Sequence, residues 1–183
     1  MAAFVLGSIT ATPAGERPDL LGAPVEAFVA EHGLGKRIGV FAIDPAISET
    51  AATQEVYGLD PAVLVNCVVV AGRREGAERV AACLIPATKR ADVNGVVRRR
   101  LDVRKASFLP QEDAVDRTGM EYGGITPIGL PADWPILVDA DAVPQALVLI
   151  GSGIRGSKLL VPGAVLAGLP GAEVIEGLGR VPA

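Results

Sequence analysis

The stretch that decides the fold is LVNCVVVAGRREGAERVAACLIPA, residues 64–87. It holds two apolar runs, 64–72 and 79–87, on either side of the charged segment RREGAE. Short apolar runs rich in valine, joined by a few polar residues and a glycine, are typical of two antiparallel strands and their turn. We therefore expect a β-hairpin here, with Cys67 and Cys83 as small buried side chains.

Further short strands and fewer helices are expected on both sides of this hairpin. Ser48 is the expected N-cap of the second helix. Residues 1–15 are expected to form a loose or edge segment, and residues 160–179 contain too many glycines and prolines for one long helix. The sequence predicts strands at 37–44, 104–110, 135–141 and 146–153, and helices at 24–33, 48–58 and 91–102.

The order of these elements indicates the fold class. Strands outnumber helices and do not alternate strictly with them, which disfavours a doubly wound parallel sheet. We expect an α+β (mixed) fold, in which helices pack outside a mixed sheet or barrel. At 183 residues the chain has the length of one domain, and half of its residues are hydrophobic, which excludes global disorder.

Composition also excludes several function classes. The net charge of -4 does not suit a protein that binds nucleic acid over its whole surface, and 4% aromatic residues argue against a base-stacking platform. The single histidine, His32, is expected in the last turn of a helix, so a Ser-His-Asp triad and a histidine-rich zinc site are not expected. We expect no metal and no cofactor.

Cysteine usage and hydropathy indicate the compartment. The two cysteines form no CxxC motif, which favours a reducing environment. The N-terminal residues lack a basic segment before their apolar run, and no apolar run reaches the length of a membrane span. We therefore expect a cytoplasmic protein with no membrane partner.

The positive charge is concentrated in one part of the chain. From Lys89 to Lys105 there are seven basic and two acidic residues, a local charge of +5, since 7 - 2 = 5. Such a stretch on an acidic chain is what a contact with a phosphate backbone requires. The alternative is a solvated helix face. The basic residues are Lys89, Arg90, Arg98, Arg99, Arg100, Arg104 and Lys105.

The segment GSGIRG, residues 151–156, matches the GxGxxG pattern of a dinucleotide phosphate loop. Pro162 interrupts the helix that should follow, and only 27 residues remain after Gly156, too few for a second nucleotide-binding half. A dinucleotide-binding oxidoreductase is therefore a third, weaker hypothesis. We favour glycines that allow close approach of backbone to a ligand or to another strand.

The segment EYGGITPIGLP, residues 121–131, is the densest group of glycines and prolines in the chain. Glycine leaves amide N–H groups uncovered, and proline fixes the turn that presents them. Such a loop suits the binding of a carboxyl-derived oxygen or an amino-acid group. The alternative is an ordinary turn between a helix and a strand.

These segments occur together in one known family. From about Ile43 to Val174 the chain resembles the YbaK/prolyl-tRNA-synthetase-associated domain family of aminoacyl-tRNA editing deacylases. The resemblance implies a barrel-like mixed β-sheet with flanking helices over residues 41–183. Residues 1–40 are then an N-terminal segment with one helix, packed on the domain or partly loose. The matching stretches are SETAATQEVYGLDPAVLVNCVVV (48–70), TGMEYGGITPIGL (118–130), PILVDAD (135–141) and VLIGSGIRGSKL (148–159).

The resemblance implies hydrolysis of the ester between a wrong, small amino acid and the terminal ribose of tRNA. Partners would be the aminoacylated 3′ end of tRNA and an aminoacyl-tRNA synthetase. Gly123 to Pro127 resembles the family's GxxxP substrate loop, whose amides would hold the aminoacyl carbonyl, and one such donor is worth about 3 kcal/mol. The implied catalytic residues are Asn66, Gly123, Gly124 and Thr126. The implied substrate contacts are Tyr122, Ile125, Pro127, Gly129, Asp139, Ser152, Gly153, Arg155 and Gly156. The implied tRNA contacts are Lys89, Arg90, Arg98, Arg99 and Lys105.

One residue departs from the family pattern. Active relatives carry a lysine in the strand after the second helix, where this chain has Asn66. Asn66 can donate a hydrogen bond but carries no charge. Three outcomes stay open: another cation replaces the lysine, the hydrolysis is slow, or the domain is a non-catalytic module that binds tRNA or aminoacyl-adenosine. Asn66 could also be a strand residue that bonds to backbone. The candidate cations are Lys89, Lys105, Arg155 and Lys158.

Overall fold

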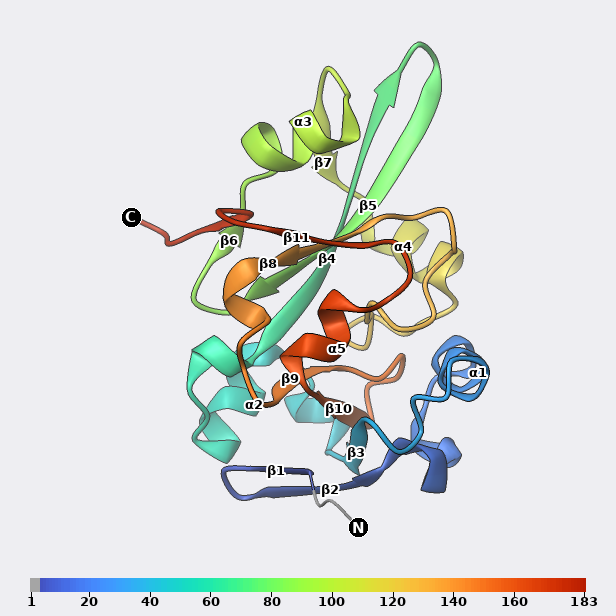
Figure 1. The fold of residues 1–183 in the computed structure, drawn as a ribbon, viewed down its shortest axis with the longest axis vertical. Helices are drawn as coiled ribbons and strands as arrows, with labels where there is room; N and C mark the ends of the chain where they lie inside the picture. The colour runs from blue at the N-terminus through green and yellow to red at the C-terminus, as the bar shows by residue number, and fades with distance from the viewer. Residues whose placement is uncertain (1–3) are drawn as a thin grey trace.

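The computed structural model describes residues 4–183, and its longest element is the expected hairpin (Figure 1). Strands β4 (Val65–Arg74) and β5 (Ala77–Pro86) pair antiparallel over ten residues each. They are joined by Glu75 and Gly76, whose φ angles are 51° and 81°. Two successive positive φ angles are typical of a type I′ turn, whose twist matches that of the flanking strands. The hairpin prediction is confirmed.

The strands form two five-stranded sheets and one two-stranded sheet. Their orders are β11-β8-β5-β4-β7, β1-β2-β3-β10-β9 and β12-β6. β8 runs parallel to β5 and β11, and the other pairs are antiparallel. A bridge between Leu64 and Leu149 links the two larger sheets. The other strands are β1 (Phe4–Leu6), β2 (Ile9–Pro13), β3 (Gly39–Ala42), β6 (Arg90–Ala91), β7 (Ala106–Phe108), β8 (Ile136–Asp139), β9 (Val148–Gly151), β10 (Ser157–Val161), β11 (Ala172–Ile175) and β12 (Gly179–Arg180).

Together the sheets curl into a half-barrel with short helices outside it (Figure 1). The expected α+β fold with a barrel-like mixed sheet is confirmed. No helix within residues 4–183 has both the length and the apolar character needed to cross a bilayer. The helices are α1 (Ala23–Glu31), α2 (Thr50–Tyr57), α3 (Arg98–Leu101), α4 (Gln111–Thr118) and α5 (Gly163–Ala167).

Several local predictions need correction. The N-cap of α2 is Glu49 and not Ser48, whose hydroxyl turns toward another loop. The helix expected at 91–102 is divided into a π-helical turn, Val93–Val97, and α3. The cause is Asp92, because its carboxylate accepts hydrogen bonds from the amides of both Gly95 and Val96. Helix α4 and strands β10, β11 and β12 are not among the predicted elements.

The GSGIRG segment is the turn between the antiparallel strands β9 and β10. No helix opens at Gly153, and the sheet is not of the Rossmann type. The dinucleotide hypothesis is therefore wrong. The physical reason is that the residues after the glycine turn, Ser157–Val161, form strand β10, which pairs antiparallel with β9. A phosphate loop would need the N-terminus of a helix at this position.

The N-terminal segment joins the main structure through a strand edge and a helix. Strands β1 and β2 extend the sheet beyond β3, so residues 4–13 form the edge segment, and residues 1–3 lie outside the described part. Val25 and Val29 of α1 belong to the same buried cluster as Ile150 and Leu159. The division of the chain at residue 40 stays a prediction.

Candidate active site

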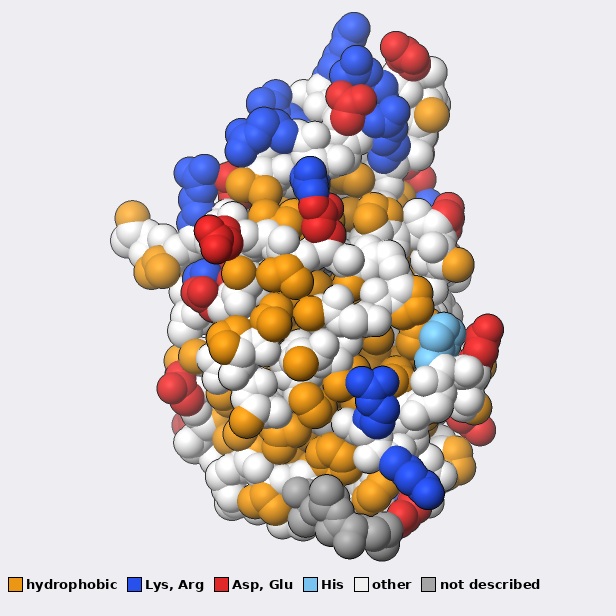
Figure 2. Space-filling view, viewed as in Figure 1, with side chains coloured by type: hydrophobic (Ala, Val, Ile, Leu, Met, Phe, Trp, Pro, Cys, Tyr) orange, Lys and Arg blue, Asp and Glu red, His pale blue; other side chains and the backbone are white. Residues whose placement is uncertain are grey.

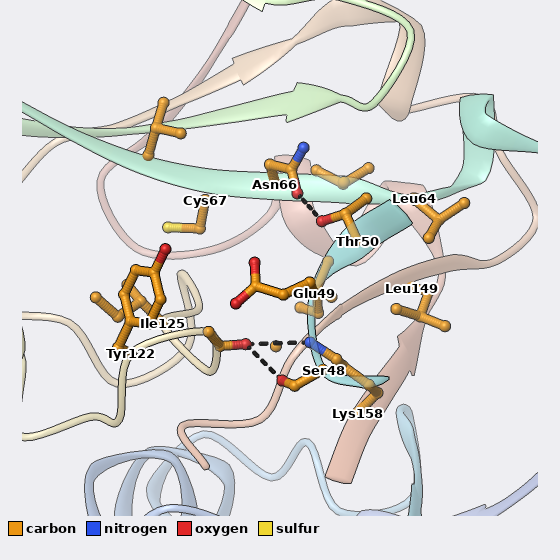
Figure 3. A pocket seen from close by; sticks show the side chains of 15 residues that line it. Ser48, Glu49, Thr50, Leu64, Asn66, Cys67, Tyr122, Ile125, Leu149 and Lys158 are labelled. Carbon is orange, nitrogen blue, oxygen red and sulfur yellow. Dashed lines mark hydrogen bonds between the residues drawn. The ribbon is translucent and has the colours of Figure 1, made fainter. Parts of the chain in front are cut away.

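A cavity of about 270 Å³ opens where the start of β4, the N-terminus of α2, the loop after α4 and strands β9 and β10 meet (Figure 3). It brings together residues that are up to 110 positions apart in sequence, from Ser48 to Lys158. Polar and apolar groups alternate around its wall. The lining residues are Ser48, Glu49, Thr50, Leu64, Val65, Asn66, Cys67, Val68, Tyr122, Gly123, Ile125, Leu149, Ile150, Gly151 and Lys158.

Asn66, at the start of β4, lines this cavity. Its Oδ1 accepts a hydrogen bond of 2.6 Å from Oγ1 of Thr50, the first residue of α2. Its partner is thus a hydroxyl of a neighbouring element and not the backbone. Because this bond uses the carboxamide oxygen, the NH₂ group is the half of the side chain left to donate.

Lys158, on β10, supplies the positive charge of the cavity. The residue is 6% exposed, and its Nζ donates a hydrogen bond of 3.1 Å to the carbonyl oxygen of Gly123. Within residues 4–183 no carboxylate pairs with this ammonium at ion-pair distance. Burial lowers the pKa of Lys158 to about 8, although the charge of Glu49 raises it. The amine therefore stays mostly protonated at neutral pH.

The loop places a carbonyl group in this environment. The Gly123 oxygen accepts from Lys158 and also from Oγ of Ser48, at 3.2 Å (Figure 3). The amide of Gly124 points the other way and donates to the Glu121 carbonyl at 2.9 Å. Of the loop amides predicted to hold an acyl carbonyl, that of Gly124 is thus occupied. The N–H groups of Gly123 and Ile125 have no hydrogen-bond acceptor within the described residues.

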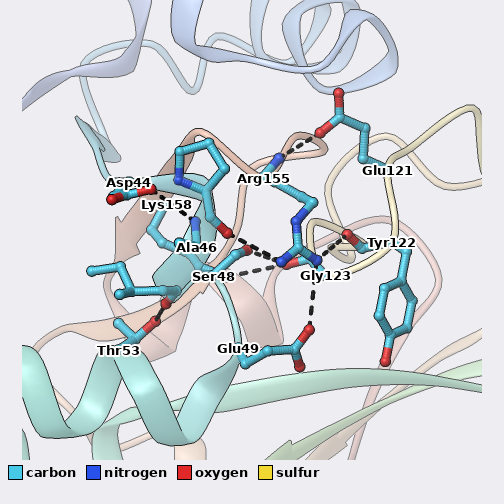
Figure 4. Close-up of polar contacts among 12 residues, drawn as sticks. Asp44, Ala46, Ser48, Glu49, Thr53, Glu121, Tyr122, Gly123, Arg155 and Lys158 are labelled. Atoms are coloured by element: carbon cyan, nitrogen blue, oxygen red, sulfur yellow. Dashed lines mark hydrogen bonds and ion pairs between the residues drawn. The ribbon is translucent and has the colours of Figure 1, made fainter.

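Arg155 ties this loop to the segment before α2 (Figure 4). Its guanidinium donates to the carbonyl oxygens of Tyr122 and Pro45, each at 3.1 Å, and lies 3.5 Å from the carboxylate of Glu49. Its own backbone N–H donates to the Glu121 carboxylate at 2.7 Å. Arg155 does not line the cavity, and its contacts give it a positioning role.

The glycine turn after β9 lies directly behind the loop. A Cβ on Gly151 would be 2.6 Å from the Gly124 oxygen, and a Cβ on Gly124 would be 2.7 Å from the Ile154 nitrogen. The Gly153 amide donates to the Gly124 carbonyl at 2.7 Å. The expectation of close backbone approach is confirmed for Gly151, which meets the Gly124 loop, and for Gly153, which meets Gly22. It is wrong for Gly156, where a Cβ would meet no atom within 4 Å, and the neighbouring segments are loops and not strands.

The other predicted substrate contacts do not line the cavity, and neither do Gly124 and Thr126, which were predicted as catalytic residues. Ser152 is buried and hydrogen-bonds to Ser157, with 2.7 Å between the two hydroxyls. A Cβ on Gly129 would meet Pro24, in the chain segment that begins α1. Thr126 is fully buried, and its hydroxyl has no hydrogen-bond partner within residues 4–183. The remaining residues outside the lining are Pro127, Asp139, Gly153 and Gly156.

The predicted tRNA contacts are divided between a buried ion pair and an exposed surface. Lys89 lies 2.9 Å from Asp139 and 2.6 Å from Asp141, and Asp139 is fully buried. Lys89 is therefore not a free cation. Lys and Arg gather at the end of the molecule that carries α3 and the tip of the β4–β5 hairpin (Figure 2). Arg90, Arg98, Arg99 and Lys105 are exposed.

Sequence reasoning did not single out Ser48, Glu49, Thr50 or Cys67 for the cavity. Their proximity to the loop follows from the curl of the sheet, which no local pattern encodes. Burial raises the pKa of the Cys67 thiol far above neutrality, so the thiol stays protonated. Cys67 therefore forms part of the cavity wall and does not act as a nucleophile. No cluster of His, Cys, Asp and Glu suited to a metal ion is found within residues 4–183.

Comparison with known proteins identifies the family and similar folds. A family model described as "Aminoacyl-tRNA editing domain" matches residues 44–169. The fold is similar to the crystal structure of a candidate trans-editing enzyme for prolyl tRNA synthetase, with a TM-score of 0.73 and 20% identity, covering 92% of this chain and 98% of the other. A hypothetical protein of known structure gives a TM-score of 0.74 at 22% identity, covering 86% and 99%. No curated protein matches the sequence significantly. The chain belongs to the aminoacyl-tRNA editing domain family.

Proposed function

We propose that this protein is an editing hydrolase that cleaves the ester of tRNA mischarged with a small amino acid. The observation that carries the proposal is the position of Lys158, whose ammonium reaches the Gly123 carbonyl in the cavity that Asn66 lines. A cation from β10 thus lines the same cavity as Asn66, the position where active relatives carry a lysine on the strand after the second helix. Membership of the editing family supports the choice of substrate.

The polar groups of the cavity suit an aminoacyl ester. Such an ester presents an ammonium next to a carbonyl carbon. The carboxylate of Glu49 can accept from the ammonium, while the free amides of Gly123 and Ile125 can donate to the ester oxygen. The charge of Lys158 stabilises the negative oxygen that forms when water attacks the ester carbon.

The apolar part of the wall limits the size of the acyl group. Leu64, Cys67, Ile125, Leu149 and Ile150 all line a cavity of only about 270 Å³. Each additional methylene changes binding by about 1–3 kcal/mol, so a tight wall discriminates between acyl groups in small steps. We therefore propose amino acids with side chains such as those of alanine, cysteine or serine.

Deacylation assays with a panel of mischarged tRNAs test this proposal. We expect wild-type protein to accelerate the release of at least one small amino acid. Lys158→Ala is expected to lower kcat by about 10²–10³, since it removes a donor and a charge close to the reacting group. Lys36→Ala, which removes an exposed lysine elsewhere, is the matched control. No acceleration over spontaneous deacylation for any member of the panel would refute the enzyme.

A second candidate function is a module that binds tRNA or aminoacyl-adenosine without cleavage. The observation that favours it is Asn66, which carries no charge and is held by Thr50. In that case the protein binds tRNA with salt-dependent affinity and shows no turnover, and Asn66→Lys gains hydrolysis. If Lys158 already acts as the cation, Asn66→Lys leaves the rate unchanged or lowers it, because two ammonium groups would then repel each other.

A further inference from the structure

A second hollow, of about 420 Å³, lies beside the edge strand β7 at the distal end of β4. It shares no residue with the cavity of the candidate active site. Its wall comes from three consecutive β4 residues, from β7 and from the start of α4. We call it the β7 groove, and its lining residues are Ala71, Gly72, Arg73, Glu78, Arg104, Lys105, Ser107, Phe108, Leu109, Pro110 and Asp113.

The cations of the β7 groove are free to bind a ligand. Arg73, Arg104 and Lys105 are exposed, and none of them has an ion-pair partner within residues 4–183. Their neighbours Arg74 and Arg79 are instead both paired with Asp102.

Two acidic residues also line the groove, and one of them already forms an ion pair with an arginine. Glu78 is paired with Arg117 at 2.8 Å. Asp113 lies in the first turn of α4. Three free cations therefore face one free carboxylate, and this excess of positive charge suits a polyanion.

Phe108 adds an aromatic surface to this charge. It is one of only seven aromatic residues in the chain and is 59% exposed, on a strand with an unpaired edge. A single ring does not make a broad stacking platform, but one exposed ring at the sheet edge, on the face opposite Arg73, suits a single base that stacks while cations along the same edge hold its phosphates. The only other aromatic ring with comparable exposure within residues 4–183 is Tyr122, at 48%, which lines the active-site cavity.

The groove and the cavity both lie along β4. Asn66 and Cys67 line the cavity from opposite faces of the strand, because adjacent side chains alternate. Arg73, which lines the groove, points to the same face as Cys67. Six residues at about 3.3 Å each separate them by roughly 20 Å. Leu109, in the groove, packs in one buried cluster with Ile125, in the cavity wall. About six stacked nucleotides, or fewer extended ones, span this distance at about 3.4 Å per step.

We propose that the β7 groove holds the RNA strand that leads away from the aminoacylated end, with Phe108 stacked on a base and Arg73, Arg104 and Lys105 on phosphates. The inference rests on the proposed function, because it assumes that the cavity receives the 3′ end of tRNA. It adds a second contact, which holds the nucleic acid at a distance from the ester.

Binding of uncharged tRNA, measured by fluorescence anisotropy over a range of salt concentrations, tests the groove. We expect the double variant Arg104→Ala/Lys105→Ala to bind at least tenfold more weakly, with the slope of log K against log salt reduced by about 1.4. The matched control is Lys36→Ala/Arg37→Ala, which removes two adjacent exposed cations from another part of the molecule and is expected to change neither quantity.

The ring is tested separately from the charges. Phe108→Ala is expected to weaken tRNA binding about tenfold with an unchanged salt slope, because stacking does not release counterions. Phe108→Trp is expected to retain the affinity. Val174→Ala, which trims another exposed apolar side chain, is the matched control.

A small substrate separates this inference from the proposed function. The groove variants are expected to lose kcat/KM on mischarged tRNA and to keep the wild-type value on an aminoacyl ester of adenosine alone. If wild-type protein cleaves neither substrate, the hydrolase proposal fails. The tRNA-binding measurements on the groove variants still test whether the β7 groove binds RNA. The inference is overturned if the groove variants bind tRNA as tightly as their controls. It is overturned also if the variants keep their tRNA affinity and lose affinity only for an acidic protein surface.

Discussion

Lys158 shows how a single residue can serve a site at a cost to the fold. Its ammonium is buried against the Gly123 carbonyl, and burial lowers the pKa of the amine to about 8. The sequence placed Lys158 among four candidate cations, but only the pairing of β3, β9 and β10 brings it into the cavity that Asn66 also lines. The choice among the four could not be predicted because it depends on contacts between distant strands.

Lys158→Met is expected to stabilise the fold at pH 7 by about 2 kcal/mol, because it removes a charge that burial disfavours. The folded pKa of about 8 lies below the ordinary lysine value of 10.5, so the unfolded chain binds more protons between these pH values. Wild-type stability therefore rises from pH 8 to pH 10.5, and the advantage of the variant narrows over that range. Urea denaturation at several pH values measures this, and an advantage independent of pH would contradict it. Lys36→Met is the control.

The same pKa gives a prediction for activity. If protonated Lys158 supports hydrolysis, kcat/KM corrected for spontaneous deacylation falls as the pH rises through about 8. The falling limb is expected to be absent in Lys158→Met, which starts from a lower rate at every pH. A pH–rate profile of both proteins on one mischarged tRNA checks this. A falling limb that persists in the variant would assign the titration to another group.

At the scale of elements, local patterns of glycine and valine predicted individual strands and turns correctly. They did not predict which distant strands pair with one another in the sheets. The β4–β5 hairpin follows from its valine runs and short turn, and close backbone approach was correctly expected at Gly151 and Gly153 of the glycine segment, but not at Gly156. Helix α4 was missed because its sequence QEDAVDRT is mostly polar and has only a short apolar face. Ser48 was wrongly taken as an N-cap because its hydroxyl bonds to a loop 75 residues away.

Gly151→Ala is expected to destabilise the protein by about 2–3 kcal/mol and to abolish activity, because its Cβ would lie 2.6 Å from the Gly124 oxygen. The loop that holds Gly123 would have to move. Gly156→Ala, in the same turn, is the matched control, since a Cβ there meets no atom within 4 Å. Chemical denaturation and deacylation assays compare the two variants. Equal effects at both positions would show that the backbone contact is unimportant.

At the scale of the whole molecule, residues 4–40 pack against the structure that carries the site. The Leu20 carbonyl accepts from Ser157 at 2.5 Å, and the Gly22 amide donates to the Ser152 carbonyl at 2.9 Å. Fully buried Val25 adds apolar contact to the same region. These contacts join segments more than 100 residues apart, so no pattern within residues 1–40 could predict them.

A fragment that begins at residue 41 is therefore expected to lose the cooperative unfolding of the full chain. Removal of the segment deletes Gly39 and Val40 of β3, which leaves Leu159 and Leu160 of β10 without these strand partners, and exposes the apolar surface that α1 covers. Differential scanning calorimetry of the fragment and the full chain measures this, and added peptide 1–40 is expected to restore part of the transition. A fragment that unfolds like the full chain would make the N-terminal segment an independent attachment.

The contact between Gly151 and Gly124 also bears on redesign of the pocket. Here two stretches of main chain are in contact with no side chain between them, so neither glycine can be replaced by a residue with a side chain unless the backbone moves. Under the proposed function, substitutions that alter acyl selectivity are instead expected at Leu149 and Cys67, whose side chains line the cavity. To admit a bulkier amino acid, smaller side chains should be introduced at these two positions, while Gly151 and Gly124 are kept.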